Sequence, residues 1–93
     1  MMSLLVRFSP ESLTGERYDE VKRRLNEAGH WPPDGLEYHV CFGSDGQLKV
    51  SEIWASTDQF EAFGQRLGPI LEEVGINQTA PPELIDIYNQ ERF

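Results

Sequence analysis

The spacing of apolar residues switches along the chain between a strand period and a helix period, and this order constrains the fold most. Apolar residues are dense or alternate in four segments, as in strands. These segments are 3–9, 36–43, 49–55 and 83–89. In 14–28 and 56–74 apolar residues recur every three or four positions, as in amphipathic helices. The sequence therefore predicts the order strand, helix, strand, strand, helix, strand.

The second expected helix carries signals at both ends. Ser56 followed by Gln59 forms a capping box at its start, and Gly75 followed by Ile76 is typical of a Schellman stop. Pro69 lies inside the helix, where a proline removes a hydrogen bond and clashes with the preceding turn. We therefore expect either a kink at Pro69 or a second short helix that begins there.

The first expected helix is ordered by charge. Asp19 and Glu20 precede Arg23 and Arg24, an order that suits the helix dipole. A spacing of four residues allows ion pairs from Asp19 to Arg23 and from Glu20 to Arg24. Gly29 then predicts the end of the helix.

Ser44-Asp45-Gly46 joins the two middle strands and is a hairpin signal. If Asp45-Gly46 is a two-residue turn, His39 faces Glu52 and Glu37 faces Trp54. His39, Glu52 and Trp54 then share one face of the sheet. A three-residue loop or a bulge would instead move Glu52 to the other face.

This element order favours a ferredoxin-like α+β sandwich, in which a four-stranded antiparallel sheet carries both helices on one face. The length of 93 residues fits one domain, 1–93. Strands have apolar residues on both alternations, so the second sheet face should also be covered. A homodimer through this open face is the simplest cover.

The charge balance argues against two classes of partner. Sixteen acidic and eight basic residues leave a net charge of −8 and a sequence pI of about 4.6. This is the wrong sign for binding nucleic acid or an anionic membrane. The N-terminal residues hold neither a basic leader nor an apolar stretch of signal length, so we expect a cytoplasmic protein. The single Cys41 cannot close an intrachain disulfide.

His39 and Glu52 are the candidate catalytic residues. A carboxylate opposite an imidazole orients the ring, which could make His39 a general base or a proton shuttle. The alternative is a cross-strand polar contact that only stabilises the sheet. A metal site is disfavoured, because one histidine with one or two acids supplies fewer ligands than zinc or iron usually takes. Cys41 has no basic neighbour to form a thiolate.

Four further side chains are candidates for the wall of a substrate pocket, beside Trp54. Trp31 lies on a proline-stiffened loop, where it could cover the pocket, contact a dimer partner or cap the core. Tyr38 could supply an apolar wall. Tyr88 and Asn89 could offer a hydroxyl and an amide, or could simply pack at a strand edge.

Five stretches spread over most of the chain carry a family resemblance. They are Trp31-Pro32-Pro33-Asp34-Gly35-Leu36 with His39, then 48–56, 60–63, 67–71, and 82–85 leading to Asn89. Together they resemble uncharacterised bacterial members of the dimeric α+β barrel superfamily, which includes antibiotic-biosynthesis-type monooxygenases. The resemblance implies the sandwich fold and the dimer. A haem-degrading branch uses an asparagine on the first strand and a histidine on the second helix, and this sequence has neither.

The function expected from these features is a cofactor-free, monooxygenase-like or isomerase-like enzyme that acts on a small aromatic or polyketide-type molecule. His39 would relay protons, Glu52 would orient it, and no cofactor or metal would be needed. The alternative is a non-catalytic small-molecule-binding or dimeric accessory protein. A third reading has no pocket and gives both sheet faces a structural role.

Overall fold

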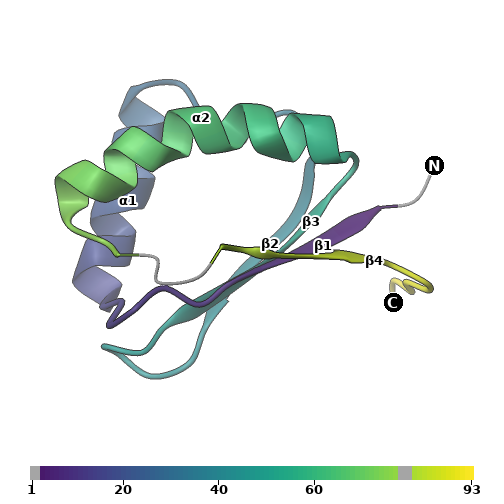
Figure 1. Ribbon diagram of the computed structural model, residues 1–93, viewed down its shortest axis with the longest axis horizontal. Coiled ribbons are helices and arrows are strands. Elements are labelled where there is room, and N and C mark those ends of the chain that lie inside the picture. Colours follow the sequence, from purple (N-terminus) through teal and green to yellow (C-terminus); the bar gives the residue numbers. More distant parts are fainter. Residues whose placement is uncertain (1–2, 78–80) are drawn as a thin grey trace.

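The computed structural model describes residues 3–77 and 81–93, and its elements follow the predicted order. They are β1 (Leu4–Phe8), α1 (Gly15–Glu27), β2 (Leu36–Phe42), β3 (Lys49–Trp54), α2 (Thr57–Val74) and β4 (Glu83–Asp86). The strands form one antiparallel sheet in the order β2-β3-β1-β4, and both helices lie on one face of it (Figure 1). The predicted ferredoxin-like α+β sandwich is therefore confirmed. Neither helix in these residues has the length and apolarity to cross a membrane.

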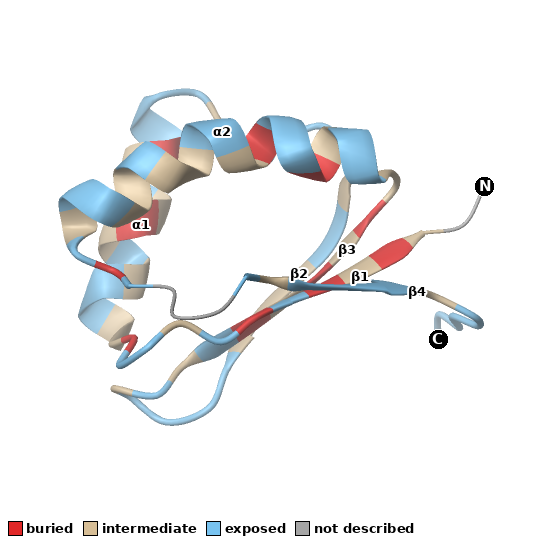
Figure 2. Cartoon of the chain, viewed as in Figure 1, coloured by how far each residue is buried: buried red, intermediate tan, exposed pale blue. Residues whose placement is uncertain are grey.

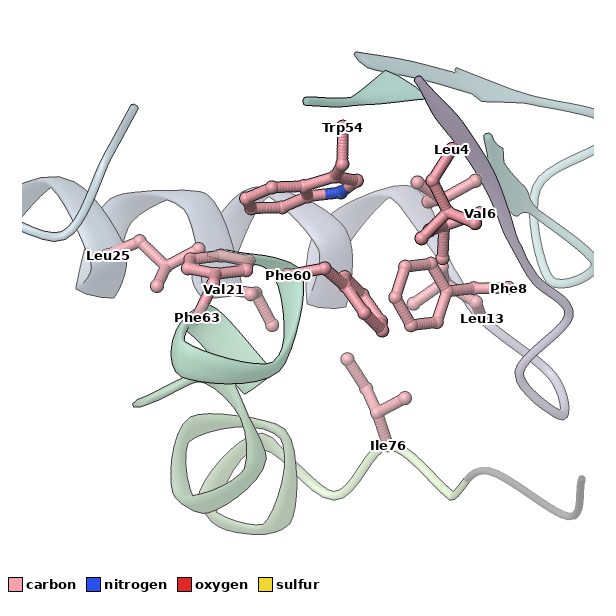
Figure 3. Packing of buried hydrophobic residues seen from close by; sticks show 11 residues of the cluster. Leu4, Val6, Phe8, Leu13, Val21, Leu25, Trp54, Phe60, Phe63 and Ile76 are labelled. Carbon is pink, nitrogen blue, oxygen red and sulfur yellow. The ribbon is translucent and has the colours of Figure 1, made fainter. Parts of the chain in front are cut away.

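The core lies between the sheet and the two helices, and it uses the inward alternation of each central strand (Figure 2). Trp54 is completely buried at its centre. Its ring centroid lies 5.6 Å from that of Phe60 and 5.5 Å from that of Phe63, both on α2. Leu25 of α1 lies in the same apolar cluster (Figure 3). Burying one such side chain stabilises a fold by about 1.5–3 kcal/mol, so these contacts hold the helices on the sheet.

The hairpin between β2 and β3 has the predicted two-residue turn. The Gln47 N–H donates to the Ser44 carbonyl at 2.8 Å, and Gly46 has a φ of +87°. His39 consequently pairs with Glu52 as predicted.

The predicted pairing of Glu37 with Trp54 is wrong. The register shifts between Leu36 and Tyr38, so Leu36 takes the place opposite Trp54. Glu37 is the extra residue at this irregularity, and its exposed carboxylate accepts a hydrogen bond from the Ser3 hydroxyl at 2.9 Å. A bulge of this kind leaves one residue without a cross-strand partner.

The predicted ends of α2 are confirmed. The Ser56 hydroxyl accepts from the Gln59 N–H at 3.2 Å. Gly75 has a φ of +85°, and the N–H groups of Gly75 and Ile76 both donate to the Leu71 carbonyl. Pro69 lies within one continuous helix, so the second helix expected to begin there is wrong. Side chains on both sides of Pro69 pack against the core and hold the helix together across the missing hydrogen bond.

The last strand is shorter than predicted. It ends at Asp86 rather than at residue 89, because Asp86 pairs with Leu4, the first residue of β1. One more hydrogen bond, from the Ile87 N–H to the Ser3 carbonyl, follows at 3.2 Å. Tyr88 is then fully exposed.

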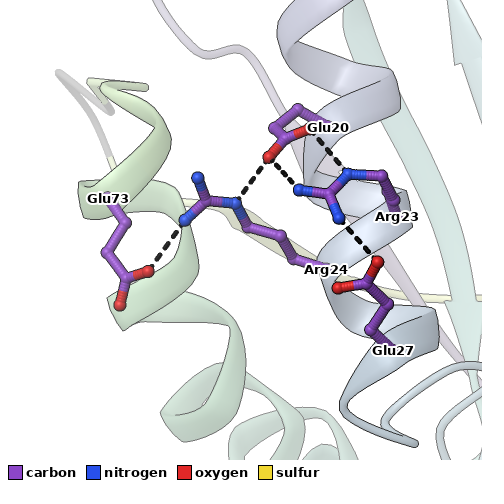
Figure 4. Close-up of polar contacts among 5 residues, drawn as sticks. All are labelled: Glu20, Arg23, Arg24, Glu27 and Glu73. Carbon is purple, nitrogen blue, oxygen red and sulfur yellow. Dashed lines mark hydrogen bonds and ion pairs between the residues drawn. The ribbon is translucent and has the colours of Figure 1, made fainter.

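A network of ion pairs runs along α1 and reaches α2 (Figure 4). Glu20 accepts hydrogen bonds from Arg23 and from Arg24, and these bonds hold the pKa of the Glu20 carboxyl at about 2. Arg24 also pairs with Glu73 of α2 at 2.8 Å. The predicted pair of Glu20 with Arg24 is confirmed. The predicted partner of Arg23, Asp19, is wrong, since Arg23 binds Glu20 and Glu27 instead.

Candidate functional site

A cavity lies between the sheet and the two helices, on the face that carries the core. It is a small cavity of about 70 Å³ with an open mouth. Apolar side chains form most of its wall. Among the residues that the structure describes, its titratable lining side chains are Tyr18, Lys22, His39 and Glu52. A largely apolar pocket with a few converging polar groups is the usual form of a small-molecule site.

Three of these side chains form a continuous chain of hydrogen bonds. The Tyr18 hydroxyl lies 2.6 Å from Nε2 of His39. Nδ1 of His39 lies 2.6 Å from Oε2 of Glu52. The other Glu52 oxygen, Oε1, accepts from the indole N–H of Trp54 at 3.0 Å. Tyr18 comes from α1, His39 from β2 and the other two from β3, so the tertiary fold itself assembles the chain.

The chemistry of these groups sets the direction of each bond. Glu52 is only 3% exposed, and as a carboxylate it can only accept. A neutral imidazole beside this carboxylate carries its proton on Nδ1 and leaves Nε2 as an acceptor, and this is the tautomer that we assign to His39. Burial, together with the nearby Cys41, Glu52 and Asp19, raises the pKa of the Tyr18 phenol to about 12, so its hydroxyl is protonated and donates to Nε2.

Trp31 encloses this chain from the loop before β2. Its ring stands edge-on to the His39 ring, with 5.0 Å between centroids, and lies 6.2 Å from the ring of Phe63. The ammonium group of Lys22 lies over the Trp31 ring, 4.0 Å from its centroid. Trp31 therefore contacts both the hydrogen-bonded chain and Lys22, which is the only lysine lining the cavity in the part of the chain that the structure describes.

The structure brings four of the seven predicted site residues together. His39, Glu52 and Trp54 share the face of the sheet that carries the helices, as predicted, and Trp31 contacts His39. Trp54 lies behind Glu52 and does not line the cavity. Its indole N–H donates to the Glu52 carboxylate instead.

Tyr38, Tyr88 and Asn89 do not line this cavity. Tyr88 and Asn89 border a separate hollow instead, so the role of these residues in a pocket stays a prediction. Tyr38 pairs with Ile53, which alternates with Glu52, so Tyr38 lies on the opposite face and is 51% exposed. Tyr88 and Asn89 follow the end of β4 and lie beside Ile53 on that open face.

Tyr18 and Lys22 are the site residues that the sequence pattern did not single out. Tyr18 lies on the apolar stripe of α1 together with Val21 and Leu25, a position that is typical of a core residue. The only local sign of their role is that the Tyr18 hydroxyl and the Lys22 ammonium are four residues apart beside that stripe. Their proximity to His39 depends on how α1 crosses the sheet.

Cys41 lies near this site, but its environment does not favour nucleophilic chemistry. Burial, with a smaller effect from Asp19, raises the pKa of the Cys41 thiol. A protonated thiol is a weak nucleophile and a weak metal ligand. Within 3–77 and 81–93, no three His, Cys, Asp or Glu side chains group closely enough to hold a metal ion.

Comparison with solved structures connects this arrangement to known folds. A variant of SnoaB, a cofactor-independent oxygenase from Streptomyces nogalater, superposes with a TM-score of 0.62 at 16% identity, over 96% of this chain and 94% of that chain. A protein of unknown function from Nitrosomonas europaea gives 0.61 at 14% identity, over 98% and 92%. A candidate antibiotic biosynthesis monooxygenase from Caulobacter crescentus gives 0.55 at 17% identity, over 97% and 92%.

No family model matches the sequence, and no curated protein matches it either. At these levels of identity, similarity to the solved structures shows the fold alone. That fold is the one implied by the resemblance to the antibiotic-biosynthesis-type monooxygenases, and this expectation is confirmed.

Proposed function

We propose that this protein is a cofactor-independent, monooxygenase-like enzyme that begins its reaction by removing a proton from a small aromatic substrate in the cavity. The observation that carries the proposal is the chain from Tyr18 through His39 to Glu52 at the wall of an apolar cavity. The shared fold with a cofactor-independent oxygenase supports the choice of reaction class.

The hydrogen-bond directions define the proton path. A substrate hydroxyl or acidic C–H beside Tyr18 gives its proton to the phenol oxygen while the phenol proton moves to Nε2 of His39. The imidazolium that forms is stabilised by the Glu52 carboxylate at 2.6 Å. Concerted transfer is favoured, because the raised pKa of Tyr18, about 12, disfavours ionisation of the phenol before the substrate gives up its proton.

Deprotonation makes an electron-rich aromatic molecule able to react with oxygen. The substrate anion supplies the electrons that reduce O₂, so the protein needs to bind the ring, remove the proton and exclude bulk water. The apolar wall and the Trp31 cover suit these tasks.

A second candidate function is small-molecule binding without catalysis. The hydrogen bond between the Tyr18 hydroxyl and Nε2 of His39 favours it. Since Glu52 already binds Nδ1, neither ring nitrogen is left for a substrate. A ligand would then meet a satisfied hydrogen-bond chain and bind mainly through apolar contacts.

Oxygen consumption distinguishes the two candidates. Aromatic compounds with an acidic position, from hydroquinone to anthrone, are incubated with the protein in an oxygen electrode. We expect Tyr18→Phe and His39→Gln each to lower turnover by about 10²–10⁴-fold, the usual contribution of a general acid–base group. His30→Gln, which changes the other histidine, should leave turnover unchanged. Turnover that survives both site substitutions refutes the proposed path, and binding without product supports the second candidate.

The open face of the sheet is a proposed homodimer interface. One row of apolar side chains crosses all four strands, from Tyr38 through Ile53 and Leu5 to Ile85. Tyr38 and Ile85 are 51% and 41% exposed, and exposed apolar patches of this kind mark protein contacts. Native mass spectrometry should give twice the chain mass for the wild type and a single chain for Ile53→Glu. A wild-type monomer at micromolar concentration would contradict the dimer.

A further inference from the structure

Lys22 places a positive charge on the cavity that the proton path does not use. It lies on α1, one turn after Tyr18, and is partly buried. Among the described residues, the ion pairs involve Arg23, Arg24 and His39, but none includes Lys22. The Trp31 ring covers one side of its ammonium group. An ammonium has three N–H donors, so donors are left for a bound group.

The net charge of the whole chain is opposite in sign to that of Lys22. The protein carries a net charge of −8, and Glu52 adds a buried carboxylate to the cavity wall. An anionic ligand therefore approaches a negative molecule and needs a local cation. Lys22 is the only lysine or arginine that lines the cavity in the described part of the chain.

The position of Lys22 fits a ligand that also reaches the proton path. Residues four apart lie one above the other on a helix, about 6 Å along its axis, so Lys22 and Tyr18 face the cavity from the same side. Trp31 contacts both ends of the site, 4.0 Å from the Lys22 ammonium and 5.0 Å from the His39 ring centroid. A planar ring can therefore pack beside Trp31 with one edge at each polar group.

We propose that the cavity binds aromatic carboxylates, with the ring among the apolar side chains and the carboxylate on the Lys22 ammonium. This inference rests on the proposed function, because it names the substrate class of the same site. Lys22 is then the residue that sets specificity, since it favours an anionic ligand over a neutral one of the same shape.

Binding of two matched compounds tests the inference. Kd values for 2-naphthoate and 2-naphthalenemethanol are measured by NMR titration of the Trp31 indole N–H signal. The wild type should bind the carboxylate about tenfold more tightly, as one charge-assisted hydrogen bond contributes about this factor. Lys22→Met, which keeps an unbranched apolar stem over Trp31, should remove this preference.

Lys49→Met is the matched control. It makes the same change of charge and side chain at an exposed site on β3 that does not line the cavity. It should keep the tenfold preference, and melting temperatures check that both variants are folded. Added salt should weaken naphthoate binding to the wild type and leave binding of the alcohol unchanged.

The outcomes separate this inference from the proposed function. Equal binding of both compounds, or a preference that survives Lys22→Met, overturns the role of Lys22 and leaves the proton path standing. If neither compound binds, the anion-site inference fails, and oxygen consumption with the neutral aromatic compounds still decides the proposed function. A preference that depends on Lys22, in a protein that never turns over any compound, supports the anion site and refutes the enzyme.

Discussion

Replacing Glu52 by leucine tests the hydrogen-bond chain through its effect on stability. The Glu52 carboxylate accepts from two donors, the Trp54 indole N–H at 3.0 Å and the His39 Nδ1–H at 2.6 Å. Leucine keeps an apolar side chain of similar size but accepts from neither. A buried donor left without an acceptor costs about 1–3 kcal/mol. Trp54 is 0% exposed and bears this cost fully, while the partly exposed His39 bears less of it.

We therefore expect Glu52→Leu to lower the free energy of unfolding by about 2–4 kcal/mol, a large part of the roughly 5–14 kcal/mol of a chain of this size. Equilibrium urea unfolding at one fixed protein concentration measures the change. Trp54→Phe removes the indole donor, so in that background Glu52→Leu should cost at least about 1 kcal/mol less than it does in the wild type. Glu37→Leu, at the exposed bulge, should stay within about 0.5 kcal/mol. A cost for Glu52→Leu below about 1 kcal/mol, or no coupling to Trp54, would show that Glu52 does not satisfy two buried donors.

Three further predictions follow from local geometry. The pKa of Glu20 is about 2 in the folded protein and 4.5 ordinarily, so its contribution to stability should be complete above pH 4.5 and lost as the pH falls toward 2. Glu20→Gln should flatten the acid-unfolding curve between pH 4.5 and 2. Pro69→Ala should raise the free energy of unfolding by about 1–3 kcal/mol, because it restores an N–H inside a continuous helix; a loss of stability in urea unfolding would contradict this. Gly35→Ala should lower the melting temperature more than Gly46→Ala, because both have positive φ but only the Gly35 Cβ would meet a neighbour, the Gln59 side chain at 2.4 Å; equal losses would show that backbone strain alone decides.

The pairing of His39 with Glu52 could be predicted because one local signal determines it. Asp45-Gly46 sets a two-residue turn, and the turn sets the register of every pair from Phe42 back to Tyr38. The bulge at Glu37 has no such signal, since a register shift near a strand end depends on how the strand leaves the sheet.

The role of Tyr18 could not be predicted from its pattern. Its place on the apolar stripe of α1 is equally consistent with a core residue, and only the packing of α1 across the sheet brings its hydroxyl within 2.6 Å of His39. The position of Tyr38 could not be predicted for a different reason. The alternation of residues along β2 places Tyr38 and His39 on opposite faces of the sheet. It does not show which face the helices cover, and they cover the face that carries His39.

The tautomer of His39 shows whether the hydrogen bonds run from Tyr18 through His39 to Glu52. NMR of the imidazole nitrogens is recorded at roughly pH 8, above the ordinary imidazole pKa, with His30→Gln used to assign the two rings. We expect a proton on Nδ1 of His39, a bare Nε2 that accepts from Tyr18, and a shift of the Nε2 signal in Tyr18→Phe. A proton on Nε2 of the wild-type ring, or an Nε2 signal unchanged in Tyr18→Phe, would contradict this expectation.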